Sequence, residues 1–344
     1  MLLAFCNPLI DVSVQVDEAF LKKWGLKNDD AILADSFFQP LIDETVRKEK
    51  AIITAGGGCQ NALVMYQWMV QKDGETIIVG SVGDDENRKI LEETLLKCGV
   101  KHHYQIIPNM CTGCCAILLC NNNRSIVASL GASGAMEYNY WETPEVINSL
   151  KKANVVMIST FFIRSSDKIA LSIALECHRR KIPLVLCLSS PSAIESVQFP
   201  TFYEIFKKAT IIFGNETEII SFAKKFKILS SEKEDVNIME LTKKIANFET
   251  PCDKRIVVTT MGSQPTIGCQ NGNEPINRST IKIENSKIID TNGAGDSFAG
   301  GFLAYYVKGC SLETCIDAGN YCASCNIQVR GCTVPNYKPD FKIQ

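Results

Sequence analysis

Short apolar runs alternate with helical patterns along most of this 344-residue chain. The runs are shorter than an ordinary helix and are bounded by turn-forming residues, which is typical of strands buried on both faces. The expected strands are Met1–Phe5, Ile52–Thr54, Ile77–Val79, Val155–Ile158, Leu184–Leu188, Ile211–Phe213 and Ile256–Thr259, and the expected crossover helices are Asn61–Val70, Glu86–Lys97, Asp167–Arg180, Thr217–Phe226 and Ile238–Phe248. The alternation predicts an α/β fold with a doubly wound, mostly parallel sheet, in which ligands bind at the carboxyl ends of the strands.

Two stretches interrupt this alternation. Leu9–Asp35 and Cys114–Leu130 contain strand-like halves without a helical pattern between them, and in the second stretch the halves flank the turn Asn121–Arg124. We therefore expect two strand pairs outside the alternating pattern.

The stretch from Asp290 to Phe298 (DTNGAGDSF) brings two glycines, a helix start and a carboxylate together. Ser286–Asp290 ahead of it predicts a short strand, and Ser297–Val307 behind it has apolar residues at helical spacing. Because Gly293 and Gly295 carry no side chains, phosphate oxygens could approach the amides of the first turn, where the helix dipole adds about half a positive charge.

Asp296 follows these glycines at the positive end of the expected helix. A carboxylate there could accept the proton of an alcohol while the neighbouring amides hold the phosphoryl group that moves onto the alcohol. The alternative is a glycine turn followed by an ordinary capping aspartate, which an isolated Gly-x-Gly-Asp more often represents.

Asn215 and Glu218 follow another apolar run, Thr210–Phe213, and lie one turn apart on an expected helix. An amide and a carboxylate so placed could hold the water shell of Mg²⁺, which prefers oxygen ligands and keeps several waters. The alternative is a capping box, with Asn at the N-cap and Glu at the third helical position. Taken alone, this segment favours the cap.

The run Gly56–Gly58 lacks the spacing of a dinucleotide fingerprint, and the chain contains no Walker sequence, so a Rossmann dehydrogenase and a P-loop kinase are both disfavoured. Two interpretations of the run have equal weight. A ligand could approach the bare backbone closely, with Asn61 one helical turn further on to hydrogen-bond it, or the glycines could simply form the entry to a helix.

The net charge of −2 provides no basic field for nucleic acid or an anionic membrane. No stretch reaches the roughly 18 apolar residues of a membrane span, and the short apolar start lacks the basic leader of a signal peptide. Sixteen cysteines in such a chain indicate free thiols in a reducing compartment, so we expect a cytoplasmic protein, with the nucleus as an alternative. Cys111 and Cys114, like Cys322 and Cys325, have zinc-like spacing but no histidine at ligand spacing, which favours structural thiols over a metal.

Five segments of the chain resemble the adenosine kinases of the ribokinase and phosphofructokinase-B superfamily. They occur in the family's order and are Cys6–Ser13, Ala55–Asn61, Asn123–Ser125, Phe213–Glu218 and Asp290–Leu303. Val79–Val100 and Gly331–Thr333 extend the resemblance over essentially the whole chain. The resemblance implies a ribokinase-like monomer that uses ATP and Mg²⁺ to phosphorylate the 5′-hydroxyl of adenosine in purine salvage, with room for a monovalent cation.

The resemblance also implies roles for residues at matching positions. Asp296 would be the general base, the amides of Gly293, Ala294 and Gly295 would stabilise developing charge, and Arg124 would neutralise the transferred phosphate. The nucleoside would be bound by Asn7, Leu9, Asp11, Leu33, Gly56, Gly57, Gly58, Asn61, Leu130, Phe161 and Phe162, with one of the two phenylalanines stacked on adenine. ATP would be bound by Asn215, Thr260, Gly262, Thr291 and Asn320, and Mg²⁺ would be held through water by Asn215 and Glu218.

In the family, the two stretches that interrupt the alternation form a small β-sheet lid, whose closure would exclude water from the reacting phosphate. The resemblance therefore implies a large nucleotide-binding α/β domain of residues 1–8, 48–107 and 136–344. The lid of residues 9–47 and 108–135 would contribute to the nucleoside site.

Several positions depart from the family pattern. Cys187 and Ser192 stand where adenosine kinases have an asparagine and an aromatic residue, which bears on phosphate and metal affinity. Gly58 and Cys59 replace a Ser-Thr pair, and Ala31 replaces a polar residue. Three hypotheses follow, namely an adenosine kinase, a related sugar or nucleoside kinase, and a catalytically weak nucleoside-binding regulatory protein. Because the base and the anion hole are intact, a working enzyme is favoured.

Overall fold

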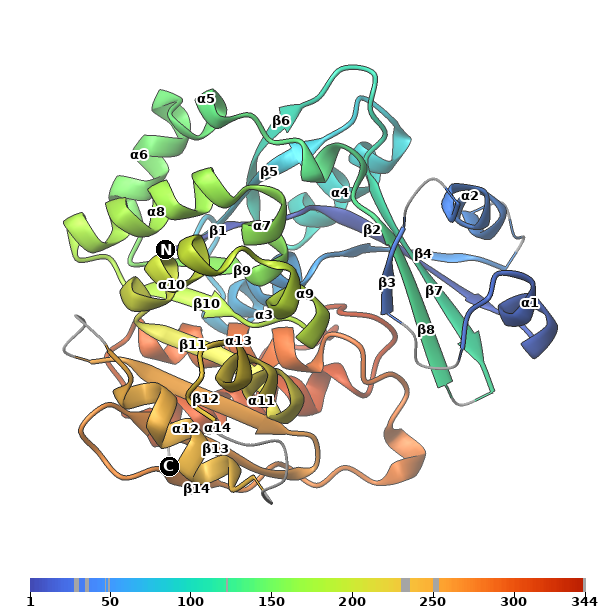
Figure 1. The fold of residues 1–344 in the computed structure, drawn as a ribbon. Helices are drawn as coiled ribbons and strands as arrows, with labels where there is room; N and C mark the ends of the chain where they lie inside the picture. Colours follow the sequence, from blue (N-terminus) through green and yellow to red (C-terminus); the bar gives the residue numbers. More distant parts are fainter. Residues whose placement is uncertain are drawn as a thin grey trace.

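The computed structural model describes residues 1–27, 31–34, 37–46, 48, 50–121, 123–229, 236–249 and 254–342. Within these ranges the chain forms a large sheet surrounded by helices and a small sheet that projects to one side (Figure 1). In spatial order the large sheet contains β14 (Ile276–Arg278), β13 (Gln264–Gln270), β12 (Ile256–Met261), β11 (Ile211–Asn215), β10 (Leu184–Cys187), β9 (Val155–Ser159), β1 (Leu2–Phe5), β5 (Thr76–Val82) and β6 (Lys101–Ile106).

Neighbouring strands of the large sheet are parallel from β12 to β6, whereas β13 and β14 are added antiparallel at one edge. Parallel neighbours need crossover connections, which bring helices onto both faces of the sheet. The expected doubly wound, mostly parallel architecture is confirmed.

Successive residues of the central strand β1 enter two different cores. Leu2 and Ala4 face one helical layer, while Leu3 and Phe5 face the other. The first layer contains α3 (Gly58–Val70), α13 (Ala294–Tyr306) and α14 (Leu312–Asn326). The second contains α5 (Tyr138–Trp141), α6 (Pro144–Lys152), α7 (Thr160–Ser165), α8 (Asp167–Arg180), α9 (Pro191–Ser196), α10 (Phe199–Lys208), α11 (Glu216–Lys225) and α12 (Ile238–Asn247).

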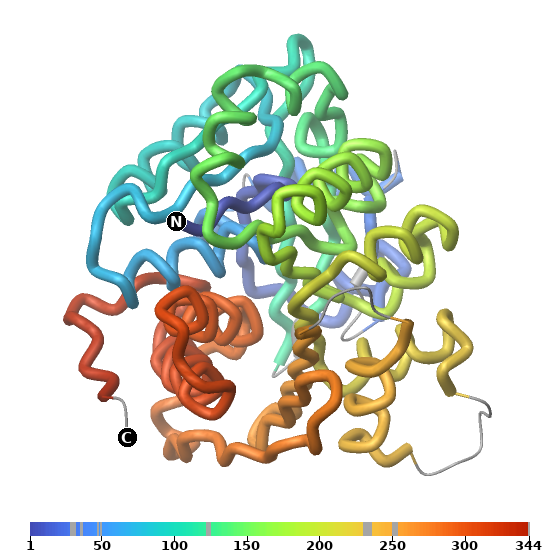
Figure 2. The backbone as a smooth tube through the Cα atoms, turned by 90° about the vertical axis from the view of Figure 1, so that its left-hand side faces the viewer, coloured from blue at the N-terminus to red at the C-terminus, as the bar shows by residue number. Residues whose placement is uncertain are grey.

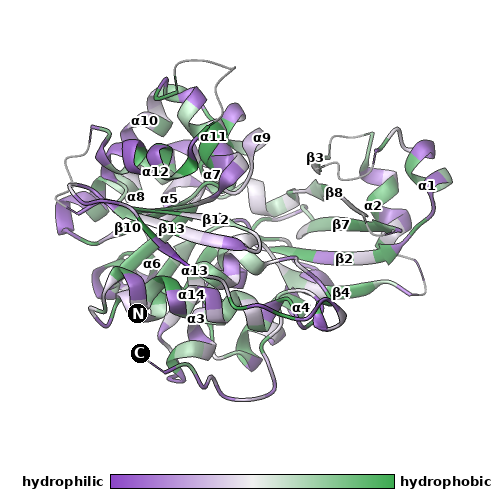
Figure 3. Ribbon diagram, turned by 90° about the horizontal axis from the view of Figure 1, so that it is seen from below, coloured by the Kyte–Doolittle hydropathy of each residue, from purple (hydrophilic) through white to green (hydrophobic). Residues whose placement is uncertain are grey.

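Figure 3 shows the large sheet between these layers, with α11 and α12 on one side and α13 and α14 on the other. Helices α13 and α14 pack side by side (Figure 2), and α13 also packs on α3. This second contact joins residues far apart in the sequence and brings the starts of α3 and α13 to the same end of the sheet.

The small sheet has the order β3 (Ala31–Leu33), β8 (Asn123–Ser129), β7 (Gly113–Cys120), β2 (Leu9–Gln15) and β4 (Ile52–Gly56). Helices α1 (Glu18–Lys23) and α2 (Gln39–Val46) pack against one face, which contains the buried residues Ile10, Val12 and Val14. The alternate residues of β2, from Leu9 to Ser13, are partly exposed on the opposite face. Helix α4 (Glu86–Lys97) contributes Leu91 to this core and Leu95 to the core of the large sheet.

The strand pair expected in Cys114–Leu130 is confirmed, because β7 and β8 are antiparallel neighbours. The pair expected in Leu9–Asp35 is wrong. Helix α1 lies between β2 and β3, and these two strands are separated in the sheet by β7 and β8. Asp35, at the end of that stretch, and Asn122, in the turn between β7 and β8, lie outside the described residues.

Two further strand predictions need correction. Ile52–Thr54 was expected in the main sheet, but β4 pairs with β2 at the edge of the small sheet, and Ile52 and Ile53 are exposed there. Ser286–Asp290 forms no strand, because its first two residues belong to the helical turn Asn285–Lys287 and the Ile289 amide donates to the Ile327 carbonyl oxygen at the end of α14. Within the described part of the chain, no helix is both long and apolar enough to cross a membrane.

Candidate active site

The turn Gly293–Asp296 starts helix α13, as the sequence predicted. Gly293 is the N-cap with φ +72°, a conformation that glycine adopts without steric cost, and its carbonyl oxygen accepts the Ser297 amide at 2.8 Å. Gly295 is exposed, and a Cβ atom there would meet nothing within 4 Å. The space beside Gly295 is therefore open at the positive end of the helix, where an anion is favoured, although the Ala294 amide donates to the Thr291 carbonyl oxygen at 3.4 Å.

Asp296 lies in this first turn and is held by helix α3. Asn61 donates its side-chain Nδ2 to Oδ2 of Asp296 at 3.0 Å, and a Cβ atom on Gly58 would lie 2.9 Å from Oδ1. Burial raises the pKa of Asp296 from 3.8 to about 6, against the opposing effect of the Asn61 hydrogen bond. The Asp296 carboxyl group is therefore more basic than that of an ordinary aspartate, yet it is ionised in about nine-tenths of the molecules at pH 7.

The three glycines Gly56–Gly58 end β4 and begin α3, with Gly57 between the two elements. Gly57 is the N-cap of α3, so the helix-entry interpretation is correct for this turn. The backbone is also approached closely, since a Cβ atom on Gly56 would lie 2.2 Å from the Asp11 carboxyl group and one on Gly57 would lie 2.8 Å from the Asn7 carbonyl oxygen. The glycines thus let Asp11 pack directly on the backbone that leads to Asn61.

Asn7 follows β1 and is almost completely buried. Its Nδ2 donates to the Ser133 carbonyl oxygen at 2.7 Å and to the Ser165 hydroxyl at 2.9 Å. Its Oδ1 is buried and has no hydrogen-bond partner among the residues that the structure describes. An unpaired buried acceptor is costly, so this oxygen is suited to a donor on a bound molecule.

The apolar residues predicted for the nucleoside site divide into two groups. Leu9 and Leu130 both pack at Gly113, where an added Cβ atom would meet Leu9 Cδ2 at 2.2 Å and the Leu130 carbonyl oxygen at 2.6 Å. Leu33 lies on β3, aligned with Ala128 of β8, and is 37% exposed.

The two adjacent phenylalanines on α7 have different environments. Phe162 is completely buried and its ring lies 6.2 Å from that of Phe5, whereas Phe161 is 41% exposed. Phe162 is therefore an ordinary core residue. Of the pair, only Phe161 has a ring face accessible to a ligand.

Asn215 and Glu218 form a complete capping box at the start of α11. Glu218 Oε2 accepts the Asn215 amide at 3.0 Å, Asn215 Oδ1 accepts the Glu218 amide at 2.9 Å, and Asn215 Nδ2 donates to Glu218 Oε1 at 2.8 Å. Burial raises the pKa of Glu218 to about 7, the Asn215 amide lowers it, and the charge of Asp296 raises it further. The capping interpretation is therefore correct. The carboxyl groups of Glu218 and Asp296 also interact electrostatically, since the charge of Asp296 affects the pKa of Glu218.

No group of three or more His, Cys, Asp or Glu side chains among the described residues is arranged to hold a metal ion directly. The two carboxyl groups of Asp296 and Glu218 nevertheless repel each other, as the effect of Asp296 on the pKa of Glu218 indicates. A hydrated cation near these carboxyl groups would reduce this repulsion, and Mg²⁺ is the kind of ion that keeps several of its waters when it binds near carboxylates.

The residues predicted for ATP extend from the end of β11 to α14. Thr260 on β12 is the register partner of Asn215, and Gly262 follows in the β12–β13 turn with φ +59°. Thr291 is exposed ahead of α13. Asn320 on α14 is buried, accepts the Thr266 hydroxyl at 2.8 Å and donates to the Ser279 carbonyl oxygen at 3.3 Å.

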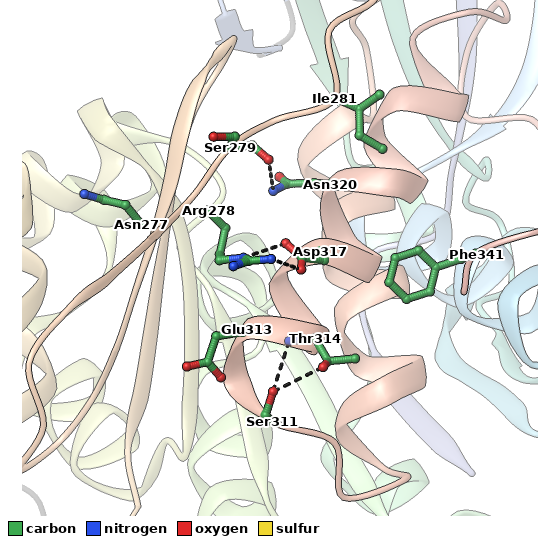
Figure 4. A pocket seen from close by; sticks show the side chains of 10 residues that line it. All are labelled: Asn277, Arg278, Ser279, Ile281, Ser311, Glu313, Thr314, Asp317, Asn320 and Phe341. Carbon is green, nitrogen blue, oxygen red and sulfur yellow. Dashed lines mark hydrogen bonds and ion pairs between the residues drawn. The ribbon is translucent and has the colours of Figure 1, made fainter. Parts of the chain in front are cut away.

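A cavity of about 630 Å³ lies beside Asn320, between α14 and the segment that contains β14. Figure 4 shows Arg278 of β14 reaching across to Asp317 of α14, with Asn320 above this ion pair and Phe341 to one side. The cavity therefore combines polar groups with an aromatic ring and lies next to one of the predicted ATP residues.

Arg124 lies on β8, aligned with Leu119 of β7, but its side chain is outside the described residues. The side chain of Ala31, one of the departures from the family pattern, is also outside them. Ser192 is in the first turn of α9, where its hydroxyl lies 3.1 Å from the hydroxyl of the N-cap Ser190.

Cys187 and Cys59 lie close to Asp296. Cys187 ends β10 as the register partner of Ser159, and the Cys59 thiol is hydrogen-bonded to Ser159. Burial raises the pKa of the Cys59 thiol to about 12 and that of Cys187 well above its usual value, and the charge of Asp296 raises both further. Both thiols are therefore neutral, and at Cys187 a weak donor replaces the amide that the family pattern has there.

Asp290 and Cys332, for which the sequence predicted no role, both support the Gly293 turn. The Asp290 carboxylate accepts the Asn292 amide and the Gly331 amide, each at 2.9 Å. A Cβ atom on Gly293 would lie 2.9 Å from Cys332 Cβ, so the turn packs tightly on this side chain. The family-like Gly331–Thr333 segment was the available signal, but no local pattern connects it to a turn that precedes it by nearly forty residues.

The pfkB family carbohydrate kinase model matches residues 19–339 of the chain. Adenosine kinase 2 of Arabidopsis thaliana is 33% identical over 99% of this chain and 97% of its own length. The solved structure of Anopheles gambiae adenosine kinase in complex with P1,P4-di(adenosine-5) tetraphosphate is 34% identical, has a TM-score of 0.90 and covers 99% of both chains. Adenosine kinase from Schistosoma mansoni in complex with 2-fluoroadenosine is 28% identical, has a TM-score of 0.89 and covers 97% of both chains.

Proposed function

Because the chain belongs to the pfkB family of carbohydrate kinases and matches adenosine kinases over nearly its whole length, we propose that it phosphorylates the 5′-hydroxyl of adenosine. ATP would be the phosphoryl donor, as the kinase family implies, and the products would be AMP and ADP. The relatives that support this proposal include structures bound to 2-fluoroadenosine and to a diadenosine tetraphosphate.

The observation that carries the mechanism is the environment of Asp296 at the start of α13. The carboxylate would accept the proton of the 5′-hydroxyl as that oxygen attacks the γ-phosphorus. Its pKa, raised by burial to about 6, keeps it ionised near neutral pH while making it a stronger base than an ordinary aspartate. The bond from Asn61 fixes the orientation of the carboxylate.

The amides of Gly293, Ala294 and Gly295 would stabilise the charge that develops on the transferred phosphoryl group. The open space in front of Gly295 and the positive end of the α13 dipole support this role. Arg124, on the small sheet, would add a further positive charge when that sheet closes over the site.

The nucleoside would bind between the two sheets. Asp11 would accept hydrogen bonds from the ribose hydroxyls, beside Gly57 and Asn61, and the unpaired Asn7 Oδ1 would accept a donor near the base. Phe161 is the exposed aromatic ring available for stacking on adenine. Leu9, Leu33 and Leu130 would complete the apolar lining.

The ATP site would extend from Thr260, Gly262 and Thr291, near the phosphates, to Asn320 beside the cavity between β14 and α14. Asn215 and Glu218 would hold Mg²⁺ through its waters. When bound, Mg²⁺ would offset the negative charge of the ATP phosphates and of the two neighbouring carboxyl groups.

Residues 9–47 and 108–135 would act as a lid on the large domain formed by the rest of the chain. The pairing of β4 with β2 favours including residues 52–56 in this lid. Lid closure would exclude water from the reacting phosphate. We further propose a cytoplasmic monomer, in line with the sequence analysis.

Cys187 favours a second candidate, a nucleoside-binding regulatory protein with weak catalysis. Its neutral thiol lies near Asp296 and Glu218, where the family pattern has an amide. A thiol is a weaker hydrogen-bond donor than an amide, so the phosphate and the ion would be held less firmly.

ATP consumption with Mg²⁺ should be measured against adenosine, inosine, guanosine, ribose and fructose, with Asp296→Asn as the blank. AMP formation from adenosine alone, lost in the variant, is the expected result. Turnover of a sugar in preference to adenosine would indicate a sibling kinase. Adenosine binding without turnover would indicate the regulatory protein.

A further inference from the structure

The segment that leads into the Gly293 turn is fastened to the end of helix α14. The amides of Ile289 and Asp290 donate to the Ile327 carbonyl oxygen at 2.8 Å and 3.3 Å. The side-chain Nδ2 of Asn326, the last residue of α14, donates to the Asn292 carbonyl oxygen at 2.7 Å. The first two contacts hold the approach to the turn, whereas the third holds the peptide that immediately precedes Gly293.

Asn326 is completely buried. Its Oδ1 has no hydrogen-bond partner within the described part of the chain, so this side chain makes a single polar contact through Nδ2. Exchanging the two amide atoms would place an acceptor against the Asn292 carbonyl oxygen, so the orientation with Nδ2 as donor is the one that chemistry allows. A buried amide with one unsatisfied atom costs free energy and is uncommon in folded proteins. The single hydrogen bond that Asn326 donates is therefore the feature that can explain this residue.

That bond determines where the Gly293 amide points. The Asn292 carbonyl and the Gly293 N–H belong to one planar trans peptide and therefore point in opposite directions. Drawing the carbonyl oxygen toward α14 therefore turns the N–H away from α14. Gly293, at φ +72°, has no Cβ to prevent this peptide from rotating, so its orientation has to be fixed from outside.

We propose that Asn326 is a positioning residue for phosphoryl transfer, which aims the Gly293 N–H into the anion hole by holding the Asn292 carbonyl oxygen. The inference rests on the proposed kinase function, since it assigns a cause to the geometry of that same site. Asn326 touches no reacting atom. It acts only through the peptide between Asn292 and Gly293.

The test compares Asn326→Leu and Asn326→Ala with Ser324→Ala. Leucine keeps the side-chain volume without a donor, and alanine only removes atoms, so one variant remains informative if the other does not fold. Ser324 lies on the same helix, is also buried and donates its hydroxyl to the Tyr321 carbonyl oxygen at 2.7 Å. Ser324→Ala therefore removes a comparable hydrogen bond from α14 that does not reach the turn.

Both Asn326 variants should lower kcat by about tenfold or more, because a misdirected donor stabilises the transition state less. The KM for adenosine and the adenosine affinity from titration calorimetry should stay within about threefold, since ground-state binding does not use this donor. Ser324→Ala should change neither parameter by more than about twofold. Wild-type kcat in both Asn326 variants, or an equal loss of kcat in Ser324→Ala, would overturn the proposal.

Hydrogen exchange of the segment 288–298 provides a measurement that does not depend on turnover. Its amides should exchange faster in Asn326→Ala than in Ser324→Ala, because the turn loses its fastening to α14. If the wild-type protein forms no AMP, the proposed function fails, and the exchange result alone still decides whether Asn326 holds the turn. Equal exchange in the two variants would refute that role.

Discussion

Replacing Asp296 with asparagine should abolish phosphoryl transfer and also stabilise the folded protein above about pH 6. The substitution preserves the shape of the side chain and an oxygen that can accept the bond from Asn61, which is 3.0 Å long in the wild type. It removes the proton-accepting charge on which the proposed chemistry depends. The same charge is disfavoured by burial, so activity and stability should change in opposite directions.

The size of the stability gain follows from the pKa of Asp296, which burial raises from 3.8 to about 6. A rise of this size corresponds to about 3 kcal/mol when the group is ionised in both the folded and the unfolded state. Asp296 keeps part of its surface exposed to solvent, so water screens some of this penalty. We therefore expect Asp296→Asn to raise the free energy of unfolding by about 1 to 2 kcal/mol.

The sign of the pH dependence is fixed by the direction of that change. A carboxyl group with a higher pKa in the folded than in the unfolded state binds its proton more tightly when folded. The penalty on the wild type is therefore absent below about pH 4, grows up to about pH 6 and is constant above it. The advantage of Asp296→Asn should follow the same course.

Urea unfolding at pH 4.5 and pH 8, together with AMP formation at pH 8, measures both effects. Asp84→Asn serves as a control for the loss of an exposed carboxylate, because the Asp84 side chain is 74% exposed and its ion pair with Arg88 lies at the surface, where such pairs contribute little. Turnover within about tenfold of the wild type, near 1.4 kcal/mol, would make a base role for Asp296 untenable. An unchanged unfolding free energy at pH 8 would refute the account of the buried charge.

Three further predictions concern the nucleoside site and its pH dependence. The kcat/KM for adenosine should fall about tenfold per pH unit below pH 6, because protonation of Asp296, with its pKa of about 6, removes the base; a flat profile down to pH 5 would contradict this. Phe161→Ala should weaken adenosine binding about tenfold in calorimetry, whereas Phe162→Ala should cost about 3 to 5 kcal/mol of unfolding free energy, because only Phe162 is buried. Gly56→Ala should raise the KM for adenosine about tenfold or more, because the added methyl would lie 2.2 Å from the Asp11 carboxyl group; an unchanged KM would exclude Asp11 from sugar binding.

The main sheet was predictable because its strands are buried on both faces and read as continuous apolar runs, as Val155–Ile158 does. Ile52–Thr54 has the same local appearance but pairs with β2 at an exposed edge. Strand pairing is a long-range property, so no window of sequence could separate these two cases. The strand predicted at Ser286–Asp290 was wrong for a similar reason. Ile288 and Ile289 have the apolar character of a strand, but both are exposed and neither belongs to a strand.

In the candidate site, too, the features that depend on neighbouring residues were predictable, whereas those that depend on long-range contacts were not. The start of α13 at Gly293 was predictable, because glycine conformation and helix capping depend on neighbouring residues. The contact between Asn61 and Asp296 joins positions 235 residues apart. The bond from Asn326 to the Asn292 carbonyl oxygen depends on how the end of α14 lies against the turn. Neither contact could be predicted from a local sequence pattern.

The direct connection of β4 to α3 has a consequence for the strength of the base. β4 is the edge of the small sheet, and two residues after it ends the chain lies against Asp296 at Gly58 and then donates to it from Asn61. Movement of the small sheet that carried Gly58 away would let water reach the carboxylate and lower its pKa. Closure of the proposed lid would do the reverse, so the proton affinity of Asp296 would change with the position of the small sheet.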